Sequence, residues 1–273
     1  MTVGSATSAT SQIEVRPVRF AFDEPVDIDS VPDDLLALAL GMLGLSLTMP
    51  YLEPYLIRTM KTAGRHIRDE RIAADVVAFS KQEGHHFRNH ANFNERVREA
   101  FPRTASEIRA IEDRLEADYR RFSKHKPLRW NLAYAEGFEA MTCAAALASA
   151  QHRVFAMGLP GGEIWDWHMA EEIEHRTVAF EAYEHIVGSY PYRVVFGARS
   201  QAHYVGYILR FARAMARGQG RPVTHHLHDF MRTQFRLWMR TFRPAYHPSE
   251  VEVPDGVEEL LVRYSASVAP HGR

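Results

Sequence analysis

The sequence predicts an all-α protein, and three observations support that fold class. Apolar residues recur at helical spacing over long stretches, and proline and glycine separate these stretches. No run of useful length alternates apolar and polar residues with the period of a strand. The chain has 273 residues, 46% of them hydrophobic, which is enough for one sizeable core. We therefore expect one helical domain over residues 31–245, with tails at 1–30 and 246–273.

The charge balance and the single cysteine exclude several classes of protein. The 33 basic and 34 acidic residues give a net charge of −1, so nothing in the composition indicates a nucleic-acid partner. Cys143 is the one cysteine, which rules out an internal disulfide framework and fits a reducing cytoplasm. The opening stretch MTVGSATSATSQ is polar and is not typical of a signal peptide. We expect a cytoplasmic protein.

The first predicted helix contains an apolar run that is close to the length of a membrane span. The run LLALALGMLGLSLTMPYL covers residues 35–52 and is at the lower limit for crossing a bilayer. Asp33 and Asp34 precede it, Pro50 interrupts it and Glu53 follows it. These residues favour a buried helix, and a peripheral membrane contact is left open as the alternative.

Proline, glycine and helix-end residues place the helices in order. The first begins after Pro32, because Asp33 and Asp34 suit the positive end of a helix dipole, and it runs to about His66. An LPGG turn at 159–162 separates two later helices. The remaining helices are expected at about 69–100, 104–122, 128–157, 163–187, 191–217 and 222–242.

The most informative stretch is WDWHMAEEIEHRTVAF, residues 165–180. His168, Glu172 and His175 lie at positions i, i+4 and i+7, so they project from one stripe of a helix. Trp165 and Phe180 indicate that this stripe is near the core. Buried carboxylates and imidazoles need charge compensation, and a metal ion supplies it.

Three other glutamates and a histidine extend this pattern to a second metal. Glu83 and His86 form a second Glu-x-x-His, and Glu53 and Glu136 lie in apolar settings in the helix before each such pair. The order Glu, ExxH, Glu, ExxH on successive helices is the ligand order of ferritin-like di-iron bundles. We therefore expect a ferritin-like four-helix bundle that binds two metal ions, with iron favoured and manganese or zinc as alternatives.

The heights of these residues along their helices agree for one pair and disagree for the other. Glu53 and Glu83 lie about 13 and 14 residues from the turn between their helices, so an antiparallel pair places them together. Glu136 lies about 22 residues before the LPGG turn and Glu172 only 10 after it, a mismatch of about 18 Å. Either the helix at 128–157 ends early or its connection folds back, and Glu139 reduces the mismatch by one turn.

Four motifs resemble those of a bacterial family labelled "predicted metal-dependent hydrolase". They are MPYLEPYLIRTM, QEGHHFRNH, AEGFEA and WHMAEEIEHRTVAFEAY, and the resemblance spans about residues 45–190. It implies a ferritin-like helical protein. Two departures, Leu52 where glycine is frequent and Gly137 where histidine is common, concern the shape of the pocket more than the ligands.

The HxxxExxH pattern also resembles the p-aminobenzoate N-oxygenase type of di-iron enzyme, which adds a third histidine to the usual six ligands. These resemblances imply the following metal ligands: Glu53, Glu83, His86, Glu136, His168, Glu172 and His175. The motif match favours Glu136 over Glu139, which is then expected to face solvent or to support a ligand.

Other polar residues near the motifs are expected to have lesser roles. His90, one turn after His86, is expected to hydrogen-bond to a ligand, since ligands need such support. His85, Glu171 and Glu174 are expected to be peripheral.

The residues favour an enzyme, and three functions remain in competition. No phosphate-binding loop, dinucleotide fingerprint or nucleophile elbow occurs in the sequence. The first hypothesis is a di-iron oxidase or oxygenase that activates O₂ to oxidise a small, apolar organic substrate, with an electron-donor protein as a further partner. The alternative is a hydrolase that uses a metal-bound water. The third is a non-catalytic metal-binding or storage protein, and a homodimer is left open.

Overall fold

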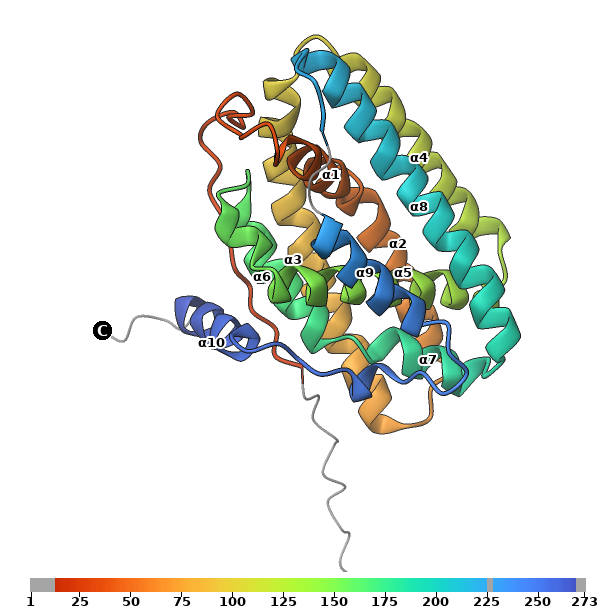
Figure 1. Ribbon diagram of the computed structural model, residues 1–273. Coiled ribbons are helices and arrows are strands. Elements are labelled where there is room, and N and C mark those ends of the chain that lie inside the picture. The colour runs from red at the N-terminus through yellow and green to blue at the C-terminus, as the bar shows by residue number, and fades with distance from the viewer. Residues whose placement is uncertain (1–12, 225–227, 269–273) are drawn as a thin grey trace, which may run out of the picture.

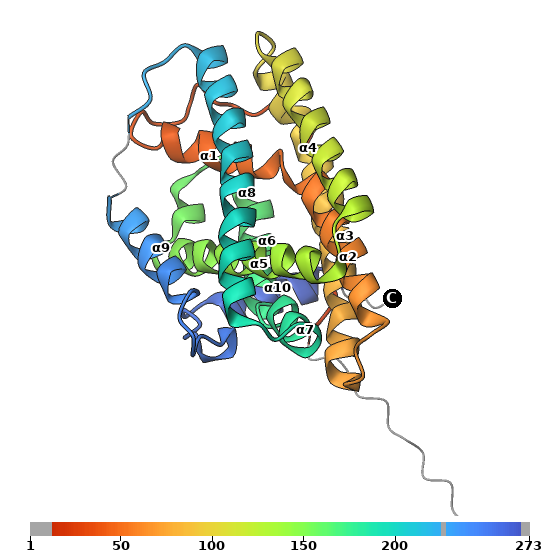
Figure 2. The ribbon, with the colours of Figure 1, turned by 90° about the vertical axis from the view of Figure 1, so that its right-hand side faces the viewer.

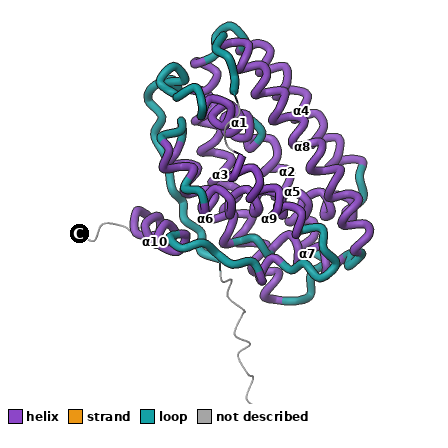
Figure 3. Tube along the Cα trace, viewed as in Figure 1, coloured by secondary structure: helices purple, strands orange, loops and turns teal. Residues whose placement is uncertain are grey.

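The computed structural model describes residues 13–224 and 228–268, and within them it contains helices and loops but no strand, as Figure 3 shows. The prediction of an all-α protein is therefore confirmed. The α-helices are α1 (Leu36–Ser46), α2 (Met49–Gly64), α3 (Glu70–Ala100), α4 (Ala105–His125), α5 (Leu128–Gln151), α6 (Gly162–Glu174), α7 (Val178–Ile186), α8 (Tyr190–Gln219), α9 (His228–Arg240) and α10 (Val257–Val268). Two short 3₁₀ turns lie at Val154–Met157 and Pro248–Glu250.

The first predicted helix is two helices, α1 and α2, bent by 46° where they meet. Pro50 explains the break, because a proline lacks the N–H that would bond the carbonyl of Ser46 in a continuous helix. The Thr48 amide and hydroxyl both donate to the carbonyl of Leu45, at 2.9 and 2.7 Å, which satisfies a carbonyl at the end of α1. No single helix in the described ranges is long and apolar enough to cross a membrane; α1 and α2 reach that length and composition only as a bent pair.

The longest of the described helices, α3, packs against α2 and lies beside it in Figure 1. Its start follows from local chemistry, because the Asp69 carboxylate accepts a hydrogen bond from the Ile72 amide at 3.0 Å. The predicted helices at 69–100, 104–122 and 191–217 correspond to α3, α4 and α8. The predicted helix at 222–242 corresponds to α9, and residues 225–227 in its first half lie outside the described ranges.

The helix α5 runs across α8, as Figure 2 shows. Their backbones approach at Gly137 and Gly197: a Cβ atom built on Gly137 would lie 2.4 Å from the Cα of Gly197. A side chain at position 137 would push the helices apart, which explains why this position holds glycine. The crossing fixes which face of α5 turns towards α2 and α6.

The connection between α5 and α6 resolves the mismatch in height. The helix α5 ends at Gln151, and a 3₁₀ turn then leads back to α6, so both of the alternatives offered above occur. Glu139 lies 12 residues before the end of α5, and Glu172 lies 10 residues after the start of α6. Since these distances agree, Glu139 and not Glu136 lies at the height of Glu172.

The helix predicted at 163–187 is also broken in two. The helix α6 ends at Glu174, and α7 begins at Val178 after a short turn. His175 is the first residue after α6, and its ring lies against Phe79 of α3 with centroids 4.8 Å apart. The break therefore places His175 at a helix end, from which its ring reaches back into the core.

Both segments expected as tails pack on the helices within the described ranges. In the N-terminal segment, Arg16 is buried and its guanidinium contacts Glu174 at 2.8 Å and Ser265 at 2.9 Å. In the C-terminal segment, residues 257–268 form α10, and the Tyr264 hydroxyl donates to the carbonyl of Glu163 in α6. In Figure 1 the N-terminal segment passes beside α10 and α6, so Arg16 joins three parts of the chain that are far apart in sequence.

Candidate metal centre

Seven acidic and histidine side chains from four parts of the fold meet in the core. They are Glu53 from α2, Glu83 and His86 from α3, Glu139 from α5, His168 and Glu172 from α6, and His175 just after α6. None of them is more than 3% exposed. Their donor atoms form three overlapping groups, in each of which the atoms lie within 4.8 Å of one another.

Many of these atoms have no hydrogen-bond partner, although they are fully buried. The unpaired atoms are both carboxylate oxygens of Glu53 and Glu83, Oε1 of Glu139, Nδ1 of His86 and Nε2 of His175. A buried polar atom without a partner is costly, and buried carboxylates are more costly still. A group of unpaired anionic and imidazole donors that face one another is the arrangement that one or more bound cations would stabilise.

Hydrogen bonds outside the group fix the free nitrogen of two histidines. The amide nitrogen of Gln82 donates to the carbonyl of Glu14 at 2.8 Å and to Glu174 at 2.7 Å, so its oxygen faces His175. That oxygen accepts from Nδ1 of His175 at 2.9 Å, which leaves Nε2 free in the neutral ring. Nε2 of His86 donates to Glu171 at 2.8 Å, which leaves Nδ1 free.

A chain of three residues, Asn94, Ser46 and His90, fixes the third histidine, His168. Asn94 donates from its amide to the carbonyl of Ser46 at 2.8 Å, so its oxygen must accept from the Ser46 hydroxyl at 2.6 Å. The Ser46 oxygen then accepts from Nδ1 of His90 at 2.8 Å. Nε2 of His90 is left as the acceptor for Nδ1 of His168 at 2.7 Å.

The result is that Nε2 of His168 carries a lone pair and points at carboxylates. It lies 3.0 Å from Oε1 of Glu172 and 3.7 Å from Oε1 of Glu53. A lone pair and a carboxylate oxygen repel one another at such distances, unless a cation or a proton lies between them. All three histidines thus present a free ring nitrogen to the same group of carboxylates, as metal ligands do.

Two carboxylates lie between the histidines. Glu172 places Oε1 at 3.0 Å from His168 and Oε2 at 3.6 Å from His175. Oε1 of Glu83 lies 3.4 Å from Nδ1 of His86 and 3.6 Å from Nε2 of His175. Glu53 lies at the end of the group that holds His86 and His168, and Glu139 lies at the end that holds His175.

Burial and the closeness of several carboxylates shift the pKa values of the group. Burial and the charges of Glu83 and Glu172 raise the pKa of Glu53 well above its usual value. Burial and the charge of Glu172 raise the pKa of Glu139 to about 8. Burial lowers the pKa of His86, but the hydrogen bond with Glu171 and the nearby charge of Glu83 outweigh burial and raise the pKa to about 9. The group therefore retains positive charge, as protons or as metal ions, near neutral pH.

The structure places Glu139, and not Glu136, beside the other donor atoms of the group. Oε1 of Glu136 accepts from Nη1 of Arg193 at 2.9 Å, on the side of α5 that faces α8. Oε2 of Glu139 lies 3.4 Å from Nε2 of His175. The motif match favours Glu136 from sequence likeness alone. Which α5 carboxylate faces the core depends instead on the crossing of α5 and α8 and on where α5 ends. Ligation by Glu139 in its place remains a prediction.

The other expected residues lie as follows. His90 contacts His168 directly, which is the supporting position expected for it. Glu171 was expected to be peripheral, but it is fully buried and bonds to His86 and Arg16. Glu174 is also bound, to Arg16 and Gln82.

Sequence reasoning missed three residues that contact the group, and also Ser46, which contacts His90; for some of them a signal was present. Gln82 directly precedes Glu83 in the QExxH motif, and Glu171 directly precedes Glu172. Thr142 donates to Oε2 of Glu172 at 2.9 Å and lies one turn after Glu139. Ser46 lies in an apolar run on α1, and nothing local indicates that it reaches His90.

An all-helical chain with a buried group of facing carboxylates and imidazoles belongs, by fold and site, to the class of candidate metal-binding proteins. A sequence model of the family described as "Predicted metal-dependent hydrolase" matches residues 14–252. The chain belongs to this family, as its motifs had indicated. No protein with a curated description and no solved structure matches the chain.

Proposed function

We propose that this protein is a metal-dependent enzyme with a dinuclear centre, and that its reaction is a hydrolysis. The observation that carries the proposal is the group of buried donor atoms in the core that face one another without hydrogen-bond partners. The family description favours hydrolysis over other reactions of such centres.

The residues fit two metal ions better than one. The proposed first site takes Glu53, His86 and His168, and the second takes Glu139 and His175. Glu83 and Glu172 lie between the two and would help to hold both ions, since each faces histidines from both sites. Four carboxylates largely neutralise two divalent ions, and imidazole suits iron, manganese and zinc alike.

The protein's own groups hold and orient this centre. Gln82, Glu171 and His90 each bond to one ligand histidine and fix its free nitrogen, and Thr142 holds Glu172. Such ions supply Lewis acidity and an activated water or, if they are redox-active, electrons for dioxygen. The apolar helices around the centre exclude bulk water, which strengthens every charge interaction within it.

We also propose that the helices that carry the ligands are a variant of the ferritin-like bundle. The ligand-bearing helices α2, α3, α5 and α6 follow one another in the ferritin-like order of Glu, ExxH, Glu, ExxH. The crossing of α5 over α8 and the break after α6 are departures from a simple antiparallel bundle.

Activation of O₂ is the second candidate function, and one observation favours it. A set of four glutamates and three histidines resembles the ligand set of the di-iron N-oxygenase type, in which the third histidine occupies the position of His168. The lone pair that His168 points at Glu53 and Glu172 supports its place in such a set. Under this alternative the metals are iron.

Metal content tests the centre itself. Metal-free protein reconstituted with Zn²⁺ or, without oxygen, with Fe²⁺ is expected to hold about two ions per chain. Glu139→Ala is expected to lose at least one ion, whereas Glu136→Ala, a matched change one turn away, keeps both. Saturation at one ion in the wild type, or equal loss from the two variants, would contradict the dinuclear assignment.

Metal identity tests the reaction. Because zinc has no redox chemistry, zinc-loaded protein should hydrolyse test compounds such as p-nitrophenyl acetate or bis(p-nitrophenyl) phosphate under the first proposal. The double variant Glu83→Ala, Glu172→Ala is the control for free metal. Rapid O₂ consumption by the ferrous protein, together with an inert zinc form, would replace hydrolysis by the second candidate.

A further inference from the structure

An apolar cavity lies between α1, α5, α8 and α9, and Met169 of α6 also lines it. Its volume is about 340 Å³. Its lining includes Met42, Leu45, Met141, Ala145 and Met169. Among the described residues that line it, only Asp34, Ser149 and Gln234 are polar, so the cavity suits an apolar ligand.

The wall of this cavity adjoins the candidate metal centre on three helices. On α1, Leu45 directly precedes Ser46, which bonds to His90. On α5, Met141 lies between Glu139 and Thr142, and on α6 Met169 directly follows His168. Consecutive residues of a helix point about 100° apart. On each of these helices, one face therefore carries residues of the centre or its supports, and the adjacent face lines the cavity.

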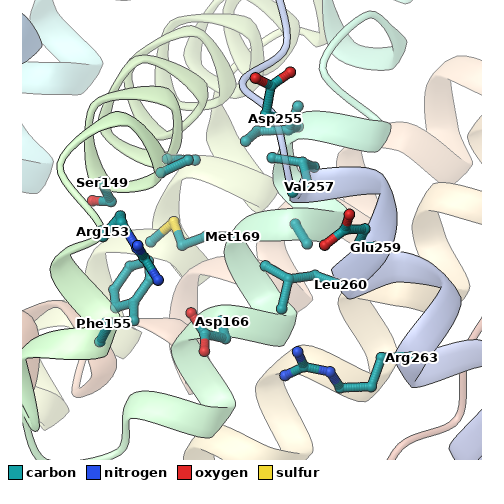
Figure 4. Close-up of a pocket in the computed structure, with 16 residues that line it drawn as sticks. Ser149, Arg153, Phe155, Asp166, Met169, Asp255, Val257, Glu259, Leu260 and Arg263 are labelled. Atoms are coloured by element: carbon teal, nitrogen blue, oxygen red, sulfur yellow. The ribbon is translucent and has the colours of Figure 1, made fainter.

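A second cavity is a poorer candidate for the same role. It lies between α5, α6 and α10, has a volume of about 260 Å³ and shares Ser149 and Met169 with the apolar cavity. Figure 4 shows that charged side chains surround Met169 there, namely Arg153, Asp166, Asp255, Glu259 and Arg263. An apolar ligand would strip water from these charges, which is costly.

We propose that the apolar cavity binds the substrate of the candidate metal centre, and that this substrate is a small molecule with an apolar chain or ring system. The inference rests on the proposed function, because it assigns the cavity to the same centre. If each ligand atom takes about the 30 Å³ of a water molecule, the cavity holds roughly ten non-hydrogen atoms. The polar group of the substrate would reach the metals past Met141 and Met169, whose unbranched side chains adapt to a ligand.

Gly41 provides a way to fill the cavity without disturbing the fold. It lines the cavity from α1, and a Cβ atom built on it has no neighbour within 4 Å. The side chain of Gly41→Leu therefore enters the cavity. Leucine also has a higher helix propensity than glycine. Gly206 of α8 is the matched control, because it lies outside the cavity and its added Cβ would meet only the end of the flexible Arg210 side chain, at 3.8 Å.

The experiment compares two hydroxamates, which bind metal ions through the same head group and differ in their tails. Acetohydroxamate and octanohydroxamate are titrated into zinc-loaded protein, and their dissociation constants are measured by calorimetry. Each buried methylene is worth about fourfold in affinity. If three of the six additional methylenes are buried, octanohydroxamate binds about 60-fold more tightly than acetohydroxamate.

The variants decide whether this gain comes from the cavity. Gly41→Leu is expected to remove at least about tenfold of the affinity for octanohydroxamate while leaving that for acetohydroxamate unchanged, and Gly206→Leu should change neither. Equal binding of the two hydroxamates, or a tail effect that Gly41→Leu leaves intact, overturns the assignment of the cavity and leaves the metal centre standing. A zinc-loaded protein that binds neither compound overturns the accessible metal centre on which both proposals rest.

Discussion

Each histidine of the candidate metal centre is bound at one ring nitrogen and free at the other. The bound nitrogens contact Glu171, His90 and Gln82, so three different partners serve the three rings. Such contacts hold a ring at the angle that a metal needs and keep the proton on the far nitrogen. Mutation of the residues that hydrogen-bond to the histidines therefore tests the centre as directly as mutation of the candidate ligands.

We predict that His90→Ala lowers the affinity of one metal ion by roughly 10–100-fold, because His168 loses the acceptor that fixes its free nitrogen. Competition with a chelator of known affinity measures the change. His203→Ala is the control, since His203 bonds to Tyr134 and Asp118 and contacts none of the seven ligand candidates. Equal losses in the two variants would show that His90 has no particular role at the centre.

Glu136 gives a prediction about pH. Burial outweighs the nearby charge of Arg193 and raises the pKa of Glu136 to about 7 in the folded protein, compared with an ordinary value near 4.5. Between these values the folded state holds a proton that the unfolded state has lost, so this group stabilises the protein less as the pH rises from about 4.5 to about 7. Glu136→Gln removes the titration and keeps a hydrogen-bond acceptor for Arg193.

We therefore expect the unfolding free energy of the wild type, relative to that of Glu136→Gln, to fall by on the order of 3 kcal/mol across this range. Urea unfolding of the metal-free proteins at pH 5, 6 and 7.5 measures the difference. A difference that is constant with pH, or that rises with it, would show that Glu136 stays ionised beside Arg193.

At the scale of elements, the contact between α5 and α8 decides which side chains of α5 reach the centre. The helices approach so closely at Gly137 and Gly197 that the added Cβ of residue 137 would overlap the backbone of α8. With α8 on this side, Glu136 meets Arg193 and the next turn presents Glu139 to the core. The crossing therefore decides which α5 carboxylate lies beside the other donor atoms.

We predict that Gly137→Ala destabilises the protein by about 3 kcal/mol or more, because an overpacked site must shift backbone to relieve the clash. Gly197→Ala is the matched change from the other helix. Its added Cβ would lie 3.4 Å from Gly137, so we expect it to alter stability by about 1 kcal/mol or less. Urea midpoints of the two variants test this, and equal effects would contradict the close approach of the helices.

At the scale of the whole molecule, the first and last segments of the described ranges meet each other and α6. Arg16 contacts Glu171 and Glu174 of α6 and also Ser265 of α10. Glu171 in turn bonds to His86, so a charged network connects the N-terminal segment to a candidate ligand. The packing of both end segments thus contributes to the order of the core.

We predict that Arg16→Met destabilises the protein by about 3–5 kcal/mol, because it leaves the buried carboxylate of Glu171 and the partly buried carboxylate of Glu174 without their guanidinium partner. Chemical unfolding of the metal-free protein measures the effect. Adding Glu171→Gln should restore part of the loss by removing one of these charges. If the double variant is no more stable than Arg16→Met, the loss comes from packing and not from charge.

Helix periodicity is a local property, so the sequence alone determined the helical class and most helix ranges. It also determined the helix stripes that carry the candidate ligands, namely Glu53, Glu83 with His86, and His168 with Glu172 and His175. The helices are interrupted at Pro50 and after Glu174, so their ends differ from the predicted ones. The stripes are unaffected, because each lies within one helix or at its end.

Only the tertiary structure decided what depends on contacts between distant segments. The choice of Glu139 over Glu136 follows from the crossing of α5 over α8. The chain from Asn94 through Ser46 and His90 joins α1 to α3 and α6, and no spacing in the sequence encodes it. Local propensity fixes which way a side chain leaves its own helix, whereas the packing of the helices fixes what it meets there.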